Sequence, residues 1–204
     1  DARSALRDAK AMLRSNKRES NLLGLEHLCF ITDASKTKPS VSSVVARTIL
    51  LGLDGDDTRE EILAMIERDV YSSMDTDDIA LMNHLDLLRQ LSLTILANAL
   101  SCCSADADFN SKVEDQSWFK EYLLPNLLDE IKRAGSNSCN ALQAAICLRS
   151  LVGTNDAVKR YLIEQGLIEP LRQTNAFGML SNKLLEEEAR KCLVILDEPL
   201  DLAD

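Results

Sequence analysis

The sequence predicts an all-helical fold, and three observations support this prediction. Apolar residues recur every three or four positions along almost the whole chain, which is the spacing of one helix face. Only seven Gly and four Pro occur in 204 residues, so few residues would interrupt long helices. The composition is 46% hydrophobic but only 4% aromatic, a balance that suits helix-on-helix packing better than a β-sandwich.

The prolines are expected to mark the limits of several helices. Pro39 suits the first position of a helix, whereas Pro125 and Pro170 should bend or divide theirs, and Pro199 should stop the last. Residues 79–103 form either one long helix or a broken pair. The predicted helices cover residues 3–14, 20–33, 41–53, 79–103, 117–134, 139–153, 156–174 and 181–197.

Two acidic stretches are typical of helix starts. Asp57 followed by Glu60 has the spacing of a capping box, in which each side chain bonds the backbone N–H of the other residue. Thr76 with Asp77 and Asp78 would place negative charge at the positive end of a helix dipole. The sequence therefore predicts a helix beginning near each stretch.

The net charge of −10 bears on the class of partner. An acidic chain repels the phosphates of nucleic acids and the surface of anionic membranes, so we expect neither as a partner. A basic peptide or basic protein patch is favoured instead. The alternative is that the charge only keeps the chain soluble.

The six cysteines predict reduced thiols. They form no C-x-x-C pair, and most lie in apolar helical stretches where a thiol behaves as a small core residue. We expect a cytoplasmic or nuclear protein. The adjacent Cys102 and Cys103 fit packing at a helix end, with a redox or lipidated pair as the alternative.

The search for catalytic and metal-binding patterns gives no strong candidate. His27 and Cys29 lie two residues apart, so on a helix they point about 200° away from each other. A calcium loop beginning at Asp54 would need Gly and Glu where the chain has Arg59 and Met65. Phosphate-binding and nucleophile motifs are also missing. We expect no enzyme, no cofactor and no metal.

Internal repetition is the most informative feature of the chain. LTILANALS (93–101), AICLRSLVG (145–153) and ARKCLVILD (189–197) share one apolar pattern, and LEHLCFITD (25–33) is a fourth copy. The interval between LEHLCFITD and LTILANALS is the longest of the three, because it holds the acidic insert around residues 54–78. A unit repeated in this way cannot bury its apolar face alone, so the units are expected to stack. Their apolar anchors are Leu28, Leu96, Leu148 and Leu193.

One stretch, NALQAAICLRSLVGTNDAVKRYLIEQGLIEPLRQ, resembles an armadillo repeat. That family's unit has a long third helix, a loop with Asn-Asp, a short first helix, a glycine and a second helix. The corresponding parts here are 142–152, Asn155 with Asp156, 158–165, Gly166 and 167–171. The resemblance is good over residues 139–196, fair over 80–138 and loose before that.

The resemblance implies a right-handed α-solenoid of about three to four armadillo-like repeats. Residues 1–204 would form one domain. Within it, 1–78 is a divergent N-terminal repeat with the acidic insert, 79–138 a second repeat, and 139–204 the best-matching repeats.

The resemblance further implies a non-enzymatic protein-interaction module, an adaptor or scaffold. The third helices of such repeats line a concave groove that holds a partner protein or peptide. Peptide-binding members carry Asn and Trp at set places in these helices. The Asn places here are Phe30, Asn98, Ser150 and Ile195, and the Trp places are Glu26, Thr94, Ile146 and Lys191. Only Asn98 fits, so the chain departs from a regular asparagine ladder.

The candidate partner-binding residues are Thr94, Asn98, Ile146, Ser150, Lys191 and Trp118. Asn98 has the alternative of an ordinary polar residue near a helix end. Trp118, beside Phe119, is either an interface anchor or a core residue. Glu186–Glu188 is either a solvated helix face or a docking site for a basic partner.

Three other functions stay open on the sequence. Small armadillo domains similar to this one also clasp chaperone ATPase domains, so a chaperone cofactor is one alternative. The chain could instead be a structural segment of a larger solenoid. A cysteine-dependent enzyme is the third alternative and belongs to a different class.

Overall fold

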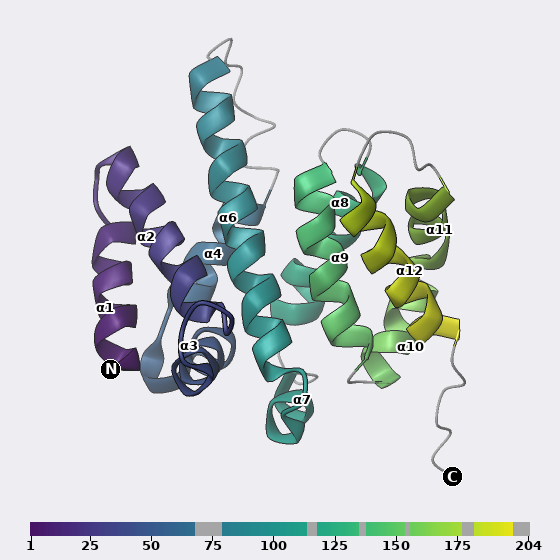
Figure 1. The fold of residues 1–204 in the computed structure, drawn as a ribbon, viewed down its shortest axis with the longest axis horizontal. Helices are drawn as coiled ribbons and strands as arrows, with labels where there is room; N and C mark the ends of the chain where they lie inside the picture. Colours follow the sequence, from purple (N-terminus) through teal and green to yellow (C-terminus); the bar gives the residue numbers. More distant parts are fainter. Residues whose placement is uncertain (68–78, 114–117, 135–137, 154–155, 177–181, 198–204) are drawn as a thin grey trace. The chain divides into compact units, whose positions relative to one another are not determined.

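The computed structural model describes residues 1–67, 79–113, 118–134, 138–153, 156–176 and 182–197. Every regular element in these ranges is a helix and none is a strand, so the all-helical prediction is confirmed. By its internal contacts the chain divides into two compact units, Asp1–Cys103 and Ser104–Asp204 (Figure 1). Among the helices of the described ranges, none has both the length and the apolar character needed to cross a membrane.

In the N-terminal unit two pairs of helices pack against each other, and a further helix packs on the second pair. Its elements are α1 (Ala2–Leu13), α2 (Arg18–Thr32), α3 (Pro39–Leu51), the short 3₁₀ helix η1 (Leu53–Gly55), α4 (Thr58–Ile66) and α6 (Ile79–Cys103). Helix α1 packs on α2, and α3 packs on α6; in addition α1 contacts α3 and α2 contacts α6. Helix α4 also packs on α6. Residues 79–103 are one continuous helix rather than a broken pair.

The core of this unit is aliphatic. Leu25, Leu28, Ile49, Leu93 and Leu96 are fully buried. Burial of Leu or Ile side chains contributes about 1.5–3 kcal/mol each, and in the described part of this unit no aromatic side chain is fully buried, so aliphatic packing holds its four main helices together.

Helices α1 and α2 approach each other closely at Gly24. A Cβ atom placed on Gly24 would lie 2.6 Å from the backbone N of Leu13 and 2.9 Å from the carbonyl O of Ala9. Asn21 fixes the same crossing, because its amide Nδ2 donates hydrogen bonds to the carbonyl oxygens of Leu13 and Ser15. The absence of a side chain at residue 24 is therefore a packing requirement.

The C-terminal unit shows the same kind of pairing. Its elements are α7 (Ala107–Val113), the π-helical turn η2 (Phe119–Leu123), α8 (Leu124–Lys132), α9 (Ser138–Val152), α10 (Asp156–Glu164), α11 (Ile168–Ala176) and α12 (Lys183–Asp197). Helix α8 packs on α9 and α11 packs on α12, while α8 contacts α11 and α9 contacts α12. Phe119, Leu127, Leu148 and Leu171 are fully buried in its core.

The predicted helical stretch 156–174 is divided at Gly166, as the repeat resemblance implied, and the break expected at Pro170 is wrong. Gly166 has φ +78°, a left-handed conformation that favours glycine. The N–H of Leu167 donates to the carbonyl of Leu162 at 3.1 Å, which closes the end of α10 as a Schellman motif. Pro170 falls in the first turn of α11, where a missing N–H costs nothing.

Pro125 divides its helix as predicted. The segment before it is π-helical, and the N–H of Leu124 donates to the carbonyl of Phe119, five residues back. The α-helical ladder of α8 begins only at Leu124, with the proline in its first turn. Because proline lacks the N–H and crowds the preceding turn, the widened π turn is a means of accommodating it.

The predicted capping box at Asp57 and Glu60 is wrong. Asp57 does precede the first residue of α4, but its carboxylate makes no capping bond. The carboxylate of Asp56 bonds to the start of the helix instead, because it accepts a 2.9 Å hydrogen bond from the N–H of Thr58. The second predicted helix start, at Thr76, and the stop at Pro199 lie outside the described residues.

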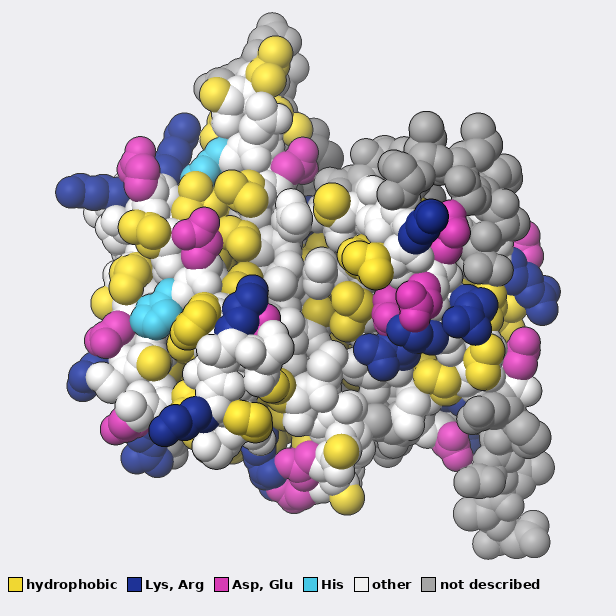
Figure 2. Space-filling view, in the orientation of Figure 1, with side chains coloured by type: hydrophobic (Ala, Val, Ile, Leu, Met, Phe, Trp, Pro, Cys, Tyr) yellow, Lys and Arg dark blue, Asp and Glu magenta, His cyan; other side chains and the backbone are white. Residues whose placement is uncertain are grey.

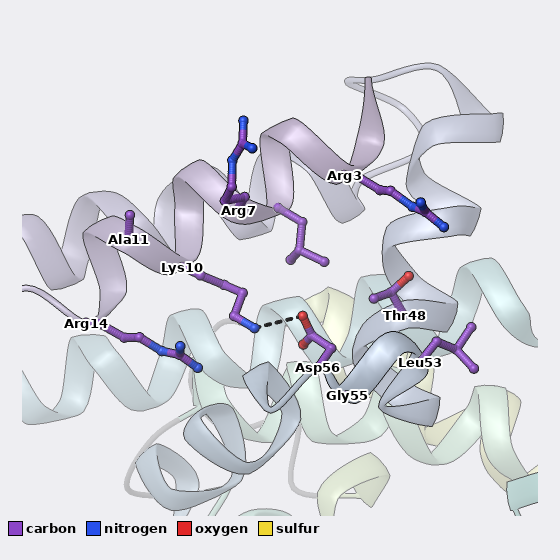
Figure 3. A pocket seen from close by; sticks show the side chains of 10 residues that line it. Arg3, Arg7, Lys10, Ala11, Arg14, Thr48, Leu53, Gly55 and Asp56 are labelled. Carbon is purple, nitrogen blue, oxygen red and sulfur yellow. Dashed lines mark hydrogen bonds and ion pairs between the residues drawn. The ribbon is translucent and has the colours of Figure 1, made fainter.

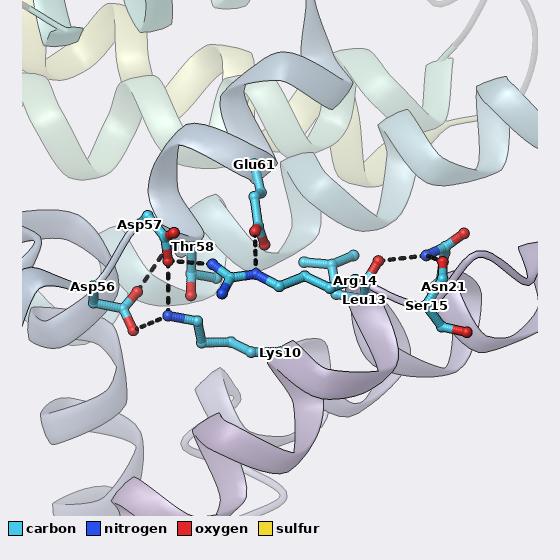
Figure 4. Close-up of polar contacts among 9 residues, drawn as sticks. All are labelled: Lys10, Leu13, Arg14, Ser15, Asn21, Asp56, Asp57, Thr58 and Glu61. Carbon is cyan, nitrogen blue, oxygen red and sulfur yellow. Dashed lines mark hydrogen bonds and ion pairs between the residues drawn. The ribbon is translucent and has the colours of Figure 1, made fainter.

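The carboxylate of Asp57 binds helix α1 rather than its own helix (Figure 4). Lys10 forms ion pairs with Asp56 at 2.9 Å and with Asp57 at 2.8 Å. Arg14, one turn further along, pairs with Asp57 and, at 2.6 Å, with Glu61. We call these five residues the α1–α4 clamp. It joins two cations to three carboxylates that lie more than forty residues away in sequence.

The clamp predicts a specific pH dependence of stability. Hydrogen bonds from Lys10 and then Arg14 lower the pKa of Asp57 from 3.8 to about 2. Since the folded pKa is depressed, the stabilisation by ionised Asp57 is present above about pH 4 and is lost as the pH falls toward 2. Asp57→Asn, which keeps a good N-cap residue, should lower the urea midpoint at pH 7. That difference from the wild type should shrink toward zero near pH 2.

The control for this prediction is Asp8→Asn, which removes an exposed carboxylate of α1 that lies outside the clamp. Its midpoint should follow that of the wild type across the same pH range. A difference between Asp57→Asn and the wild type that stays constant from pH 7 to pH 2 would contradict the assigned ion pairs.

Candidate functional site

The two predicted residues of the N-terminal unit, Thr94 and Asn98, lie one turn apart on α6. The amide Nδ2 of Asn98 donates to the carbonyl of Cys29 at 3.2 Å and to Oγ1 of Thr32 at 3.5 Å. These bonds tie α6 to the last turn of α2 and leave Oδ1 of Asn98 as an acceptor. The Thr94 hydroxyl donates to the carbonyl of Gln90 at 2.8 Å, within its own helix. Both side chains are half-buried.

Exposed apolar side chains also lie on α2 and α6, and the sequence analysis did not propose them as binding residues. Leu23 and Phe30 on α2 are 55% and 48% exposed, and Leu87 on α6 is 40% exposed. Figure 2 shows hydrophobic side chains gathered over α2 and α6. We call Leu23, Phe30, Leu87, Thr94 and Asn98 the α2–α6 face. The detectable signal was the pair Leu23 and Phe30, two turns apart and off the core stripe of Leu25 and Leu28.

Three predicted residues of the C-terminal unit lie on α9 and α12. Ile146 is half-buried, and Ser150 is 6% exposed with its hydroxyl donating to the carbonyl of Ile146 at 3.0 Å. Lys191 on α12 forms ion pairs with Glu187 at 2.9 Å and Glu188 at 2.8 Å. Ser150 thus offers a partner very little surface, whereas Lys191 is engaged by two carboxylates of its own helix.

A charged network extends from Lys191 to α9. Glu188 also binds Nε of Arg149, so it lies between two cations (Figure 2 shows charged side chains over α9 and α12). Partial burial alone would raise the pKa of Glu188, but the hydrogen bonds from Lys191 and Arg149 outweigh it and lower the pKa. Of Glu186–Glu188, two residues therefore form ion pairs within the unit.

Trp118 lies directly before η2 and is 7% exposed. Its ring meets that of Phe119 edge-on, with centroids 5.8 Å apart and an interplanar angle of 89°. This geometry is a favourable aromatic pairing inside the unit. The tryptophan presents almost no surface in this conformation.

The six candidates are thus distributed over both units: Thr94 and Asn98 in the first, and Ile146, Ser150, Lys191 and Trp118 in the second. Thr94 and Asn98 share α6, Ile146 and Ser150 share α9, and α12 with Lys191 packs on α9. Trp118 lies on none of these helices. That all six line one groove stays a prediction.

Four cysteine thiols have a raised pKa. Burial raises the pKa of Cys29 and of Cys192 to about 12, and it also raises the pKa of Cys102 and Cys147. These thiols are protonated at neutral pH, and nucleophilic catalysis requires the thiolate. Within the described residues no three His, Cys, Asp or Glu side chains gather as metal ligands would.

Comparisons with known proteins return no match. No protein-family model matches the chain, and neither a curated protein nor a solved structure is significantly similar to it.

Proposed function

We propose that the chain is a non-enzymatic protein-interaction module, built as an armadillo-like solenoid of about three to four repeats, that holds a segment of a partner protein on its third helices. The observation that carries this proposal is the pattern of contacts between helices within each unit. The side chains of the α2–α6 face would form the binding surface.

Stacked repeats make contacts between equivalent helices of neighbouring units. In the N-terminal unit, α1 contacts α3 and α2 contacts α6; in the C-terminal unit, α8 contacts α11 and α9 contacts α12. Each unit therefore has two layers, one of which contains the repeated segments. The anchors Leu28, Leu96 and Leu148 of those segments are fully buried on α2, α6 and α9.

The α2–α6 face has the chemistry of a peptide-binding surface. Apolar side chains of adjacent helices, such as Phe30 and Leu87, are typical interface anchors when a partner covers them. Asn98 adds a free acceptor, Oδ1, and the exposed Glu26 lies between Leu23 and Phe30 on α2. The partner segment would therefore carry apolar side chains next to basic ones.

The test removes the apolar anchors without changing the core. Leu23→Glu with Phe30→Glu should weaken binding of the physiological partner by about tenfold or more, because exclusion of water from apolar anchors is lost. A partner would first be captured from native lysate with the wild-type chain and identified. Its dissociation constant would then be measured with purified proteins by calorimetry.

The matched control is Val44→Glu with Tyr122→Glu, which adds the same two charges at side chains that are each 48% exposed but lie on α3 and η2. The proposal requires the control to keep wild-type affinity. If both double variants bind the partner as tightly as the wild type does, the binding surface lies elsewhere. Chemical modification of the partner by the chain would show that the chain is an enzyme.

A further inference from the structure

The outer side of α2 alternates acidic and apolar side chains. Glu19, Leu23, Glu26 and Phe30 follow one another at intervals of four, three and four residues, which places them on one side of the helix. All four are exposed, and Figure 2 shows acidic and hydrophobic side chains next to each other over α2. We call these four residues the α2 row. It lies opposite the buried side of α2, which packs within the unit.

The carboxylates of the α2 row have no counter-ion among the described residues. Neither Glu19 nor Glu26 takes part in an ion pair or a side-chain hydrogen bond there. The hollow along α1 differs in this respect, because the clamp already binds two of its cations; Lys10, for example, pairs with Asp56 at 2.9 Å (Figure 3). The α2 row, unlike the clamp, therefore leaves two negative charges for a partner.

The spacing of the α2 row favours a helical partner over an extended one. The row covers eleven residues of helix, about 16.5 Å, so its successive side chains lie about 5.5 Å apart along the axis. A second helix lying along α2 repeats its side chains at the same intervals, so each member of the row can meet one residue of the partner. Side chains on one side of an extended segment recur about every 6.7 Å, and after three steps they would be about 3–4 Å out of register.

The charge of the α2 row favours a basic partner. Two unpaired carboxylates repel acidic segments and attract Lys or Arg, and the net charge of −10 adds to that attraction at long range. On the basis of the proposed function, in which Leu23 and Phe30 are anchors, we propose that the α2 row binds a basic amphipathic helix of a partner protein. The partner sets Lys or Arg against Glu19 and Glu26, and apolar side chains against the two anchors.

The experiment measures the binding of labelled peptides to the full chain by fluorescence anisotropy. The first peptide is Lys-Ala-Gln-Ala-Leu-Ala-Gln repeated three times, which has the helical spacing of the α2 row, and saturable binding to the wild type is expected. A second peptide has the same composition, but its Lys and Leu residues alternate at every second position. It should bind about tenfold more weakly, because its charged and apolar side chains no longer lie along one side of a helix.

A reversal of charge tests the two predicted ion pairs. Glu19→Lys with Glu26→Lys should weaken binding of the first peptide by about tenfold or more, because each attraction becomes a repulsion. The same variant should bind a third peptide, in which Glu replaces every Lys. The matched control is Glu121→Lys with Glu164→Lys, which adds the same charge at exposed residues of the C-terminal unit. The control should change the affinity for the first peptide by no more than about twofold.

Four results would overturn the proposal. Absence of saturable binding would exclude a basic helix as the partner, and equal binding of the first and second peptides would show that helical spacing does not matter. Unchanged binding of the first peptide to the Glu19 and Glu26 variant would place its site elsewhere. Equal weakening by the variant and the control would mean long-range attraction without a site. Circular dichroism verifies that the variants, all at exposed residues, are folded.

Failure of this proposal can be distinguished from failure of the proposed function. The partner captured from lysate would also be measured with Glu19→Gln and Glu26→Gln combined, which should weaken binding by about fivefold. Loss of affinity only in Leu23→Glu with Phe30→Glu would keep the α2–α6 face as the binding surface and exclude the basic helix. Wild-type affinity of both double variants would exclude the α2–α6 face itself.

Discussion

Gly24→Ala is expected to lower the free energy of unfolding by about 1–2 kcal/mol. A methyl group in this position meets the backbone of α1, at 2.6 Å from the N of Leu13, and backbone atoms cannot rotate out of the way. Over-packing of this kind costs about 1–3 kcal/mol. The higher helix propensity of alanine offsets about 1 kcal/mol of this cost. The measurement is urea unfolding followed by far-ultraviolet circular dichroism.

The control for Gly24→Ala is Glu26→Ala, an exposed change on the same helix that should shift the urea midpoint very little. A stability equal to or higher than that of the wild type in Gly24→Ala would contradict the close approach of α1 and α2. In that case helix propensity alone would decide the effect.

Leu148→Ala is expected to lower the free energy of unfolding by about 2–5 kcal/mol, the usual cost of a cavity at a buried leucine. Leu148 is fully buried between α9 and its neighbours. Leu193, the equivalent anchor of the next repeated segment, is only half-buried on α12. Leu193→Ala should therefore cost about 1 kcal/mol.

The comparison separates burial from sequence pattern. Both substitutions remove the same atoms from the same place in a repeated segment, so any difference in free energy reflects the packing around each leucine. A cost for Leu193→Ala as large as that for Leu148→Ala would contradict the half-exposed position of Leu193. The slope of free energy against urea should stay unchanged in both variants, so that the two values are comparable.

The helical periodicity was sufficient to predict most of the helices, but the short helix α7 (Ala107–Val113) lies outside every predicted range. Leu28, Leu96 and Leu148 were identified as anchors from the repeated pattern alone, and all three are fully buried. Periodicity succeeds here because the contacts of a helix follow from its own spacing. Leu193 occupies the same place in the pattern but is less buried, because burial also depends on which neighbouring helices pack on the residue.

The errors of the sequence analysis come from interactions that are distant in sequence. Asp57 and Glu60 have the spacing of a capping box, but the cations that bind Asp57 are on α1 and compete successfully for its carboxylate. Local spacing contains no information about such partners. The division at Gly166 followed from the repeat resemblance, whereas the break expected at Pro170 did not occur, because proline is tolerated in the first turn of a helix.

The candidate site was predictable only in part. Thr94 and Asn98 lie one turn apart on α6, as helical spacing requires, and their binding of a partner stays a prediction. The exposed Phe30 and Leu87 of the α2–α6 face were not proposed as binding residues, because an apolar residue on a helix is assigned to the core unless the neighbouring helices are known.

The contacts of α1 also bear on how the chain folds during synthesis. Helices α2 and α3 bury α1, and both end before Glu61. The carboxylates that bind Lys10 and Arg14 belong to residues 56–61. Contacts of short sequence separation form quickly, and a growing chain folds from its N-terminal end. Helix α1 thus meets its core and its counter-ions early, and its apolar face is covered before α6 and the C-terminal unit have been made.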